Sequence, residues 1–180
     1  MAVSSVGGTI DLSGIDLSGM SIDTAMLLVQ TAVIQNQTSD VEDYMKKVQD
    51  SNVKLQKANT ASELLNNMIN DFGSETNVSK NYSSTGASDK NAKLIALSDA
   101  LVAAGLDPIA GVSDGGNPNL GALQKGLEAI ANSKSTTNNA SQLDMVKLQS
   151  AMSQMSTSVS TATSAIKAIA DSKQGIARNM

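Results

Sequence analysis

The sequence predicts an all-α protein in which two long terminal helices form a coiled-coil hairpin, joined by a small, loop-rich helical insert. Three observations support this fold. Apolar residues recur at seven-residue intervals near both ends of the chain, which is the repeat of helices that wrap around each other. Aromatic residues make up 2% of the 180 residues, too few for the aromatic-rich core of an ordinary compact enzyme. No glycine or proline interrupts residues 24–71.

The N-terminal helix is expected over residues 24–72, with Ser21 or Asp23 capping its start and Gly73 ending it. A helix of this length would extend ~75 Å. Its heptad a positions are Leu27, Ile34, Val41, Val48, Leu55, Ser62 and Ile69, and its d positions are Gln30, Gln37, Tyr44, Ser51, Ala58, Leu65 and Phe72. The coiled-coil and assembly residues predicted here are Leu27, Ile34, Val41, Val48, Leu55, Leu65 and Ile69.

The C-terminal helix is expected over residues 140–180 and carries the same repeat. Its two sets of seam positions are spaced alternately by three and four residues, and only Lys173 breaks the pattern. The coiled-coil and assembly residues predicted here are Met145, Met152, Val159 and Ile166 in one set, and Leu148, Met155, Ala162 and Ile169 in the other.

The middle region, residues 73–139, lacks the heptad repeat and is expected to be a variable, surface-exposed insert with two short helices. The first is expected from a cap at Ser88 to about Ala104, and the second from a cap at Asn117 to about residue 132, with Pro118 at its first position. Their apolar faces are Leu94, Leu97 and Leu101 in the first and Leu120, Leu123, Leu127 and Ile130 in the second. Residues 133–139 are polar and are either a loop or the first turns of the next helix.

Residues 1–23 are predicted to be a flexible N-terminal export segment. They contain a tandem repeat, residues 10–14 and 15–19, whose glycines oppose a helix. A flexible tail and an uncleaved export signal both fit this composition. The segment lacks the charged start and apolar run of a cleaved signal peptide, and no membrane-spanning segment is expected.

The composition excludes most catalytic chemistry. The chain has no cysteine and no histidine, which rules out disulfides, the usual zinc sites and Ser-His-Asp triads. The net charge is −4, and the basic stripe and aromatic platform typical of nucleic-acid binders are missing. Acidic residues such as Asp144 and Asp171 are isolated on helical faces. We therefore predict that the protein is not an enzyme and has no catalytic residues, cofactor or metal site.

The surface of the C-terminal helix is unusual for a coiled coil in water, because residues 148–166 carry no charge. Exposed coiled-coil faces are normally covered with Glu and Lys. Small uncharged side chains instead favour close packing against further helices, so this stretch indicates self-assembly. A plain antiparallel hairpin with a bland surface is the alternative.

Two short strings in the chain carry a family resemblance. They are Ser88-Asp89-Lys90-Asn91-Ala92-Lys93 and Asn138-Asn139-Ala140-Ser141-Gln142-Leu143-Asp144. With their spacing and the run of Gln, Met, Ser and Leu after the second, they resemble segments of the EspA family of secreted filament subunits, which includes SseB-like proteins. The resemblance covers about residues 88–172, and the second string has one extra residue, Ala140.

This resemblance implies a subunit of a type III secretion system that polymerises helically into a hollow extracellular filament on the bacterial surface. The filament would extend the secretion needle and carry translocators and effectors toward a host cell. The implied partners are other copies of the chain, the needle, translocator proteins, unfolded effector passengers and a cytosolic chaperone, with no nucleic acid. A translocator or needle-tip protein and a cytosolic coiled-coil adaptor are the alternatives.

Overall fold

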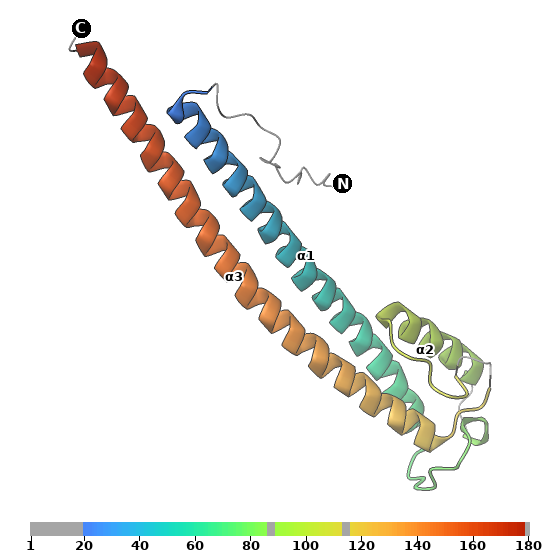
Figure 1. Cartoon of the computed structure of the whole chain (residues 1–180). Helices are drawn as coiled ribbons and strands as arrows, with labels where there is room; N and C mark the ends of the chain where they lie inside the picture. Colours follow the sequence, from blue (N-terminus) through green and yellow to red (C-terminus); the bar gives the residue numbers. More distant parts are fainter. Residues whose placement is uncertain (1–19, 86–88, 113–115, 179–180) are drawn as a thin grey trace. The chain divides into compact units, whose positions relative to one another are not determined.

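The computed structural model describes residues 20–85, 89–112 and 116–178. Over these residues the chain is helical, with α1 (Ile22–Asn70), the 3₁₀-helix η1 (Tyr82–Ser84), α2 (Lys90–Ala104) and α3 (Leu120–Arg178) (Figure 1). The described residues form no β-strand, only an isolated bridge between Asn81 and Asn119. The prediction of an all-α protein with two long terminal helices is confirmed. The export segment predicted for residues 1–23 lies mostly outside the described residues.

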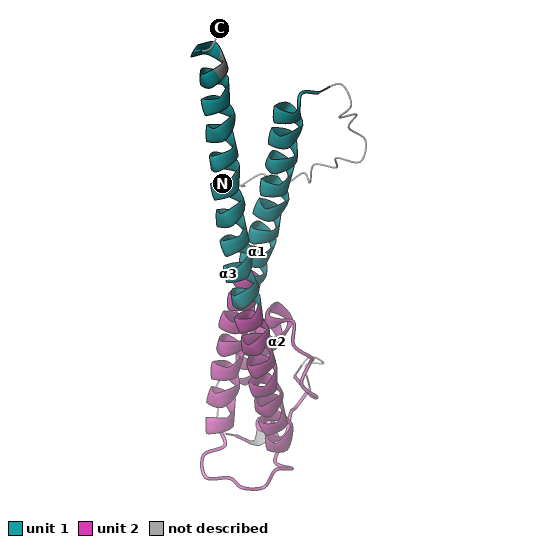
Figure 2. Cartoon of the chain, turned by 60° about the vertical axis from the view of Figure 1, so that its left-hand side comes forward, with its two compact units in different colours: residues 1–47, 144–180 teal, residues 48–143 magenta. Residues whose placement is uncertain are grey.

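Two compact units divide the chain (Figure 2). Unit 1 combines Met1–Lys47 with Asp144–Met180, and unit 2 is Val48–Leu143. Both long helices therefore contribute to both units.

The expected helix ends agree with the structure at three positions. The Ser21 hydroxyl accepts a hydrogen bond from the Thr24 backbone N–H at 3.2 Å, as an N-cap does. Gly73 and Gly105 follow α1 and α2 with φ of 62° and 65°. This left-handed conformation costs glycine little and other residues more, so both glycines suit helix C-termini.

The second short helix of the middle region does not exist as a separate element. Its residues are the first turns of α3, which runs through residues 133–139 without a break. No glycine or proline stops the helix there, and Ser133, Lys134 and Thr137 are half-buried at the spacing of the neighbouring seam. The predicted cap at Asn117 is also wrong, because Asn119 Oδ1 accepts the hydrogen bond from the Ala122 N–H at 2.8 Å.

Asn117 instead binds the segment that precedes α2. Its Oδ1 accepts a hydrogen bond from the Ser83 backbone N–H at 2.6 Å. Nearby, the Tyr82 N–H donates to the Pro118 carbonyl oxygen at 2.8 Å, and the Leu120 N–H donates to the Lys80 carbonyl oxygen at 2.9 Å. These bonds fix the loop after α1 against the start of α3.

Unit 2 has a closed hydrophobic core. Residues 48–70 of α1, all of α2 and residues 120–143 of α3 surround it (Figure 2, magenta). Leu65, Leu97 and Leu123 are 0% exposed, one from each helix, and burying a side chain of this size stabilises by about 1.5–3 kcal/mol. The apolar faces predicted for the insert therefore turn into this core, except that Leu127 is only partly buried.

A polar cluster fastens the turn after α1 to α2. The Tyr82 hydroxyl donates a hydrogen bond to Asp71 Oδ2 at 2.5 Å, and Lys93 Nζ lies 2.8 Å from the same oxygen. Burial alone would raise the pKa of Asp71, but the hydrogen bonds from Lys93 and Tyr82 outweigh it and hold that pKa below its ordinary value. The hydrogen bond to Asp71 also raises the pKa of Lys93.

Replacing Asp71 by Asn should destabilise the chain by about 1 kcal/mol at neutral pH, because the amide lacks the charge that holds Lys93. The folded-state pKa of Asp71 lies below the ordinary 3.8. The stabilisation that the Asp71 carboxylate provides is therefore present in full above pH 3.8 and is lost as the pH falls through the folded-state pKa. Urea unfolding followed by circular dichroism should show the wild type and Asp71→Asn converging below pH 3.8. Asp99→Asn, at an exposed position of α2, is the control and should change the free energy of unfolding at neutral pH by less than about 0.5 kcal/mol.

Candidate assembly surface

Unit 1 is built from two antiparallel helical segments, residues 22–47 of α1 and 144–178 of α3 (Figure 2, teal). The a and d positions predicted for α1 are all buried or half-buried in this unit, namely Leu27, Gln30, Ile34, Gln37, Val41 and Tyr44. The Thr38 hydroxyl lies 3.7 Å from Met155 Sδ and links the two helices. The register predicted for the N-terminal helix therefore matches the exposure pattern.

The same pattern continues along α1 into unit 2. Val48, Leu55 and Ile69 are half-buried there, and Leu65 is fully buried in the core. All seven residues predicted for the N-terminal seam thus lie on the less exposed side of their helix.

On α3 one of the two predicted sets of seam residues agrees with the structure, and the other set lies one position too far along the chain in every heptad. Leu148, Met155, Ala162 and Ile169 are buried or half-buried, as expected for a seam. Their partners at the other seam position are Asp144, Ala151, Ser158 and Ala165, which are also buried or half-buried. The predicted residues Met145, Met152, Val159 and Ile166 are 44–52% exposed instead.

The physical reason for this correction is side-chain size. The small side chains of Ala151, Ser158 and Ala165 allow α3 and α1 to approach each other closely at the seam. The larger residues one position later then point away from the seam. Sequence periodicity favours the larger apolar set, because a repeat of alanine and serine has little hydrophobic signal of its own.

The seam of unit 1 is weak compared with the core of unit 2. The side-chain oxygens of Gln30 and Gln37 are buried without a hydrogen-bond partner in the described part of the chain. An unsatisfied buried acceptor costs about 1–3 kcal/mol. Most seam side chains are only half-buried, because the unit holds no third helix among the described residues to cover them.

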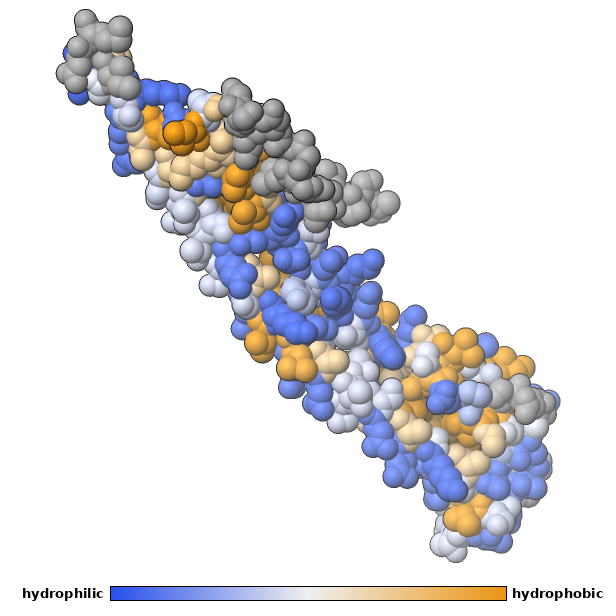
Figure 3. All heavy atoms as spheres, viewed as in Figure 1, coloured by the Kyte–Doolittle hydropathy of each residue, from blue (hydrophilic) through white to orange (hydrophobic). Residues whose placement is uncertain are grey.

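Two rows of large apolar side chains remain exposed in unit 1. We call Ile22, Met26, Val29 and Val33 the α1 stripe, and Met145, Met152, Val159 and Ile166 the α3 stripe. Their members are between 39% and 85% exposed. Figure 3 shows hydrophobic patches that reach the surface of this part of the chain. Regularly spaced apolar rows of this kind mark interaction surfaces more often than isolated exposed residues do.

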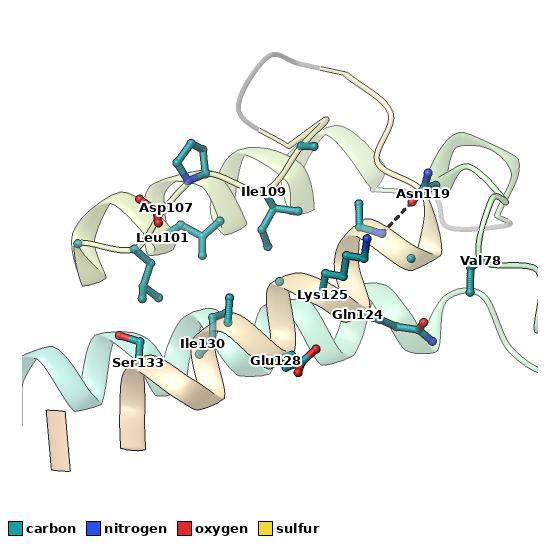
Figure 4. Close-up of a pocket in the computed structure, with 18 of the residues that line it drawn as sticks. Val78, Leu101, Asp107, Ile109, Asn119, Gln124, Lys125, Glu128, Ile130 and Ser133 are labelled. Carbon is teal, nitrogen blue, oxygen red and sulfur yellow. Dashed lines mark hydrogen bonds between the residues drawn. The ribbon is translucent and has the colours of Figure 1, made fainter. Parts of the chain in front are cut away.

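Unit 2 also contains a cleft of about 950 Å³ between the segment after α2 and the start of α3 (Figure 4). Ile109 packs over Gly126, where any β-carbon would collide with its Cδ1 atom. Asp107, Lys125 and Glu128 line the cleft beside apolar residues. Among the described residues no group of three acidic, His or Cys side chains is arranged to hold a metal ion. The cleft shows no arrangement to which a reaction can be assigned.

The comparisons with known proteins bear on the helix that carries the α3 stripe. Residues 111–179 match the family described as type III secretion needle MxiH, YscF, SsaG, EprI, PscF, EscF. The C-terminal part of the chain resembles a type III secretion needle subunit. The match begins in the loop before α3 and covers this helix to its end. No curated protein and no solved structure is significantly similar to the chain.

The match supports a needle-type or filament subunit of this secretion system. The narrower resemblance to EspA and SseB-like filament subunits stays a prediction. Within the described residues, the hydropathy of each helix falls short of what crossing a membrane requires.

The corrected register of α3 can be tested with two aspartates. Ala162→Asp places a carboxylate in the seam, at a position 8% exposed, and should destabilise unit 1 by at least about 2 kcal/mol. Val159→Asp, at a position 44% exposed, should change the stability of the dilute chain by less than about 0.5 kcal/mol. Hydrogen exchange of the amides in residues 144–170 measures both. Equal losses of protection would show that the register is wrong.

Proposed function

We propose that this chain is the structural subunit of a hollow extracellular filament that extends a type III secretion needle. The observation that carries the proposal is the match of residues 111–179 to the needle family. The matched stretch contains the whole α3 stripe, so the part of the chain that resembles needle subunits also has an exposed row of apolar side chains.

The packing of unit 1 supports self-assembly. Helices gain most of their stability in proteins from burying an apolar face, and here both helices leave part of that face exposed. Neighbouring copies would cover it. Residues 148–166 carry no charge, so copies packing along this stretch need not desolvate any ion.

The remaining regions have proposed roles in the same assembly. Residues 1–23 serve as the export segment, and residues 73–139 form the outer surface of the filament. The filament carries translocators and unfolded effectors from the bacterium toward the host cell. A cytosolic chaperone covers the long helices before export by packing its own helices against their apolar faces. These assignments rest on the exposed stripes and on the family resemblances.

Purified chain without its chaperone should polymerise as its concentration rises. Light scattering over a concentration series, with electron microscopy of the products, measures this. Co-expression with the chaperone should suppress polymerisation, because the chaperone occupies the same apolar surfaces. A monomer that persists at every concentration would contradict the filament role and favour a coiled-coil adaptor.

The outer position of the middle region has a separate test. A short epitope inserted between Gly115 and Gly116 should leave polymerisation intact, since lengthening a loop adds only about 0.6 kcal/mol per doubling. Antibody should bind it along intact polymers. The matched control is the same epitope placed between Val159 and Ser160, within α3, which should prevent assembly. An epitope at Gly116 that antibody reaches only after the polymers dissociate would place this region inside the filament.

A further inference from the structure

The α1 stripe and the α3 stripe lie on opposite sides of the helix pair in unit 1. With Leu27 at position a, Met26 and Val33 of the α1 stripe occupy g positions. On α3, where Met155 is a seam residue at position a, Met152 and Val159 occupy e positions. In an antiparallel pair the e positions of the two helices share one side of the seam and the g positions share the other, because one helix is reversed.

A contact in unit 1 agrees with this geometry. Thr38, at an e position of α1, places its hydroxyl 3.7 Å from Met155 Sδ. The e side of α1 therefore lies against α3, on the side where the α3 stripe runs. The α1 stripe, at g and c positions, faces away from it. Neither stripe can cover the other within one copy of the chain.

The two stripes match each other in chemistry. Residues 24–39 and residues 148–166 are both free of charged side chains. Within these two ranges, neither surface repels the other by charge or requires the burial of an ion. The α1 stripe has the alternating four- and three-residue spacing of a coiled-coil seam.

The α3 stripe also lies in a second seam of its own helix. A second row of exposed residues follows the α3 stripe, each member four positions after a stripe residue and, where the stripe continues, three before the next one. This row is Gln149, Ser156, Thr163 and Ala170. Except for Gln149 these are small residues, which let a second helix approach closely. α3 thus has one row of small residues in its seam with α1 and a second row of mostly small residues that is exposed beside the α3 stripe.

We propose that the α1 stripe of one copy packs against the α3 stripe of the next copy. This pairing rests on the proposed filament function and names the surfaces that build the filament. Two different patches on opposite sides of a subunit make a heterologous contact, which continues from copy to copy when the rotation does not close a ring. Two copies joined in this way still expose one stripe of each kind, so a third copy can add.

Two double variants test the pairing, each with one stripe blocked. Val29→Glu with Val33→Glu blocks the α1 stripe, and Met152→Glu with Val159→Glu blocks the α3 stripe. All four positions are exposed, so circular dichroism of the dilute variants should match the wild type. Each variant alone should fail to polymerise, with the critical concentration raised at least about tenfold, because a charge is placed in the proposed interface.

Mixtures distinguish this pairing from others. An equimolar mixture of the two variants retains one intact α1 stripe and one intact α3 stripe, so it should form dimers and nothing larger in analytical ultracentrifugation. Either variant added to wild-type chain should bind one end of a growing polymer and stop it. Electron microscopy should then show shorter polymers as the share of variant rises.

Matched controls carry the same charge away from the stripes. Gln35→Glu with Gln49→Glu at b positions of α1 and Ser153→Glu with Ser160→Glu at f positions of α3 change exposed residues outside both stripes. Both double variants should polymerise at the wild-type critical concentration. Loss of polymers in these controls would attribute the effect to charge alone and overturn the pairing.

Three further results would overturn the proposal. A blocked variant that dimerises by itself would show that like stripes pair. A blocked variant that polymerises normally would show that its stripe is not in the interface. A mixture of the two variants that stays monomeric, together with single variants that do not shorten wild-type polymers, would show that the stripes do not meet. Wild-type chain that never polymerises contradicts the filament function itself, which separates that failure from the other three.

Discussion

Two packed helices can bury only the sides that face each other, and this limit governs unit 1. Its seam positions are mostly half-buried, and the buried side-chain oxygens of Gln30 and Gln37 have no partner there among the described residues. In unit 2, α2 supplies a third side, and leucines from all three helices are fully buried. The same two long helices therefore complete a core where a third helix is present and leave an unfinished interface where it is not.

This contrast gives the two units different proposed roles. Unit 2 has the closed core and the Asp71, Tyr82 and Lys93 cluster that ties its loops together, so it is suited to hold the subunit in one conformation. Unit 1 exposes apolar rows on a surface with few charges. Under the proposed function, neighbouring copies supply the burial that the subunit cannot provide for itself, and polymerisation takes the place of a third helix.

Several features followed from local sequence alone. The all-α class, the register of α1 and the helix ends at Ser21, Gly73 and Gly105 each depend on interactions within a few residues, such as a side-chain cap or a left-handed glycine. The continuity of α3 through residues 133–139 did not follow. A polar stretch without glycine or proline allows either a loop or a helix, and packing against neighbouring helices decides between them.

The sequence by itself determined that both ends of the chain form heptad helices and that residues 148–166 carry no charge, because both are properties of residue order. It could not determine which of two adjacent rows on α3 faces α1. Periodicity favours the larger row of Met152 and Val159, whereas the tertiary structure places Ala151 and Ser158 in the seam. The choice depends on how closely two helices approach, and that distance is set by the side chains of both helices together rather than by either sequence segment alone.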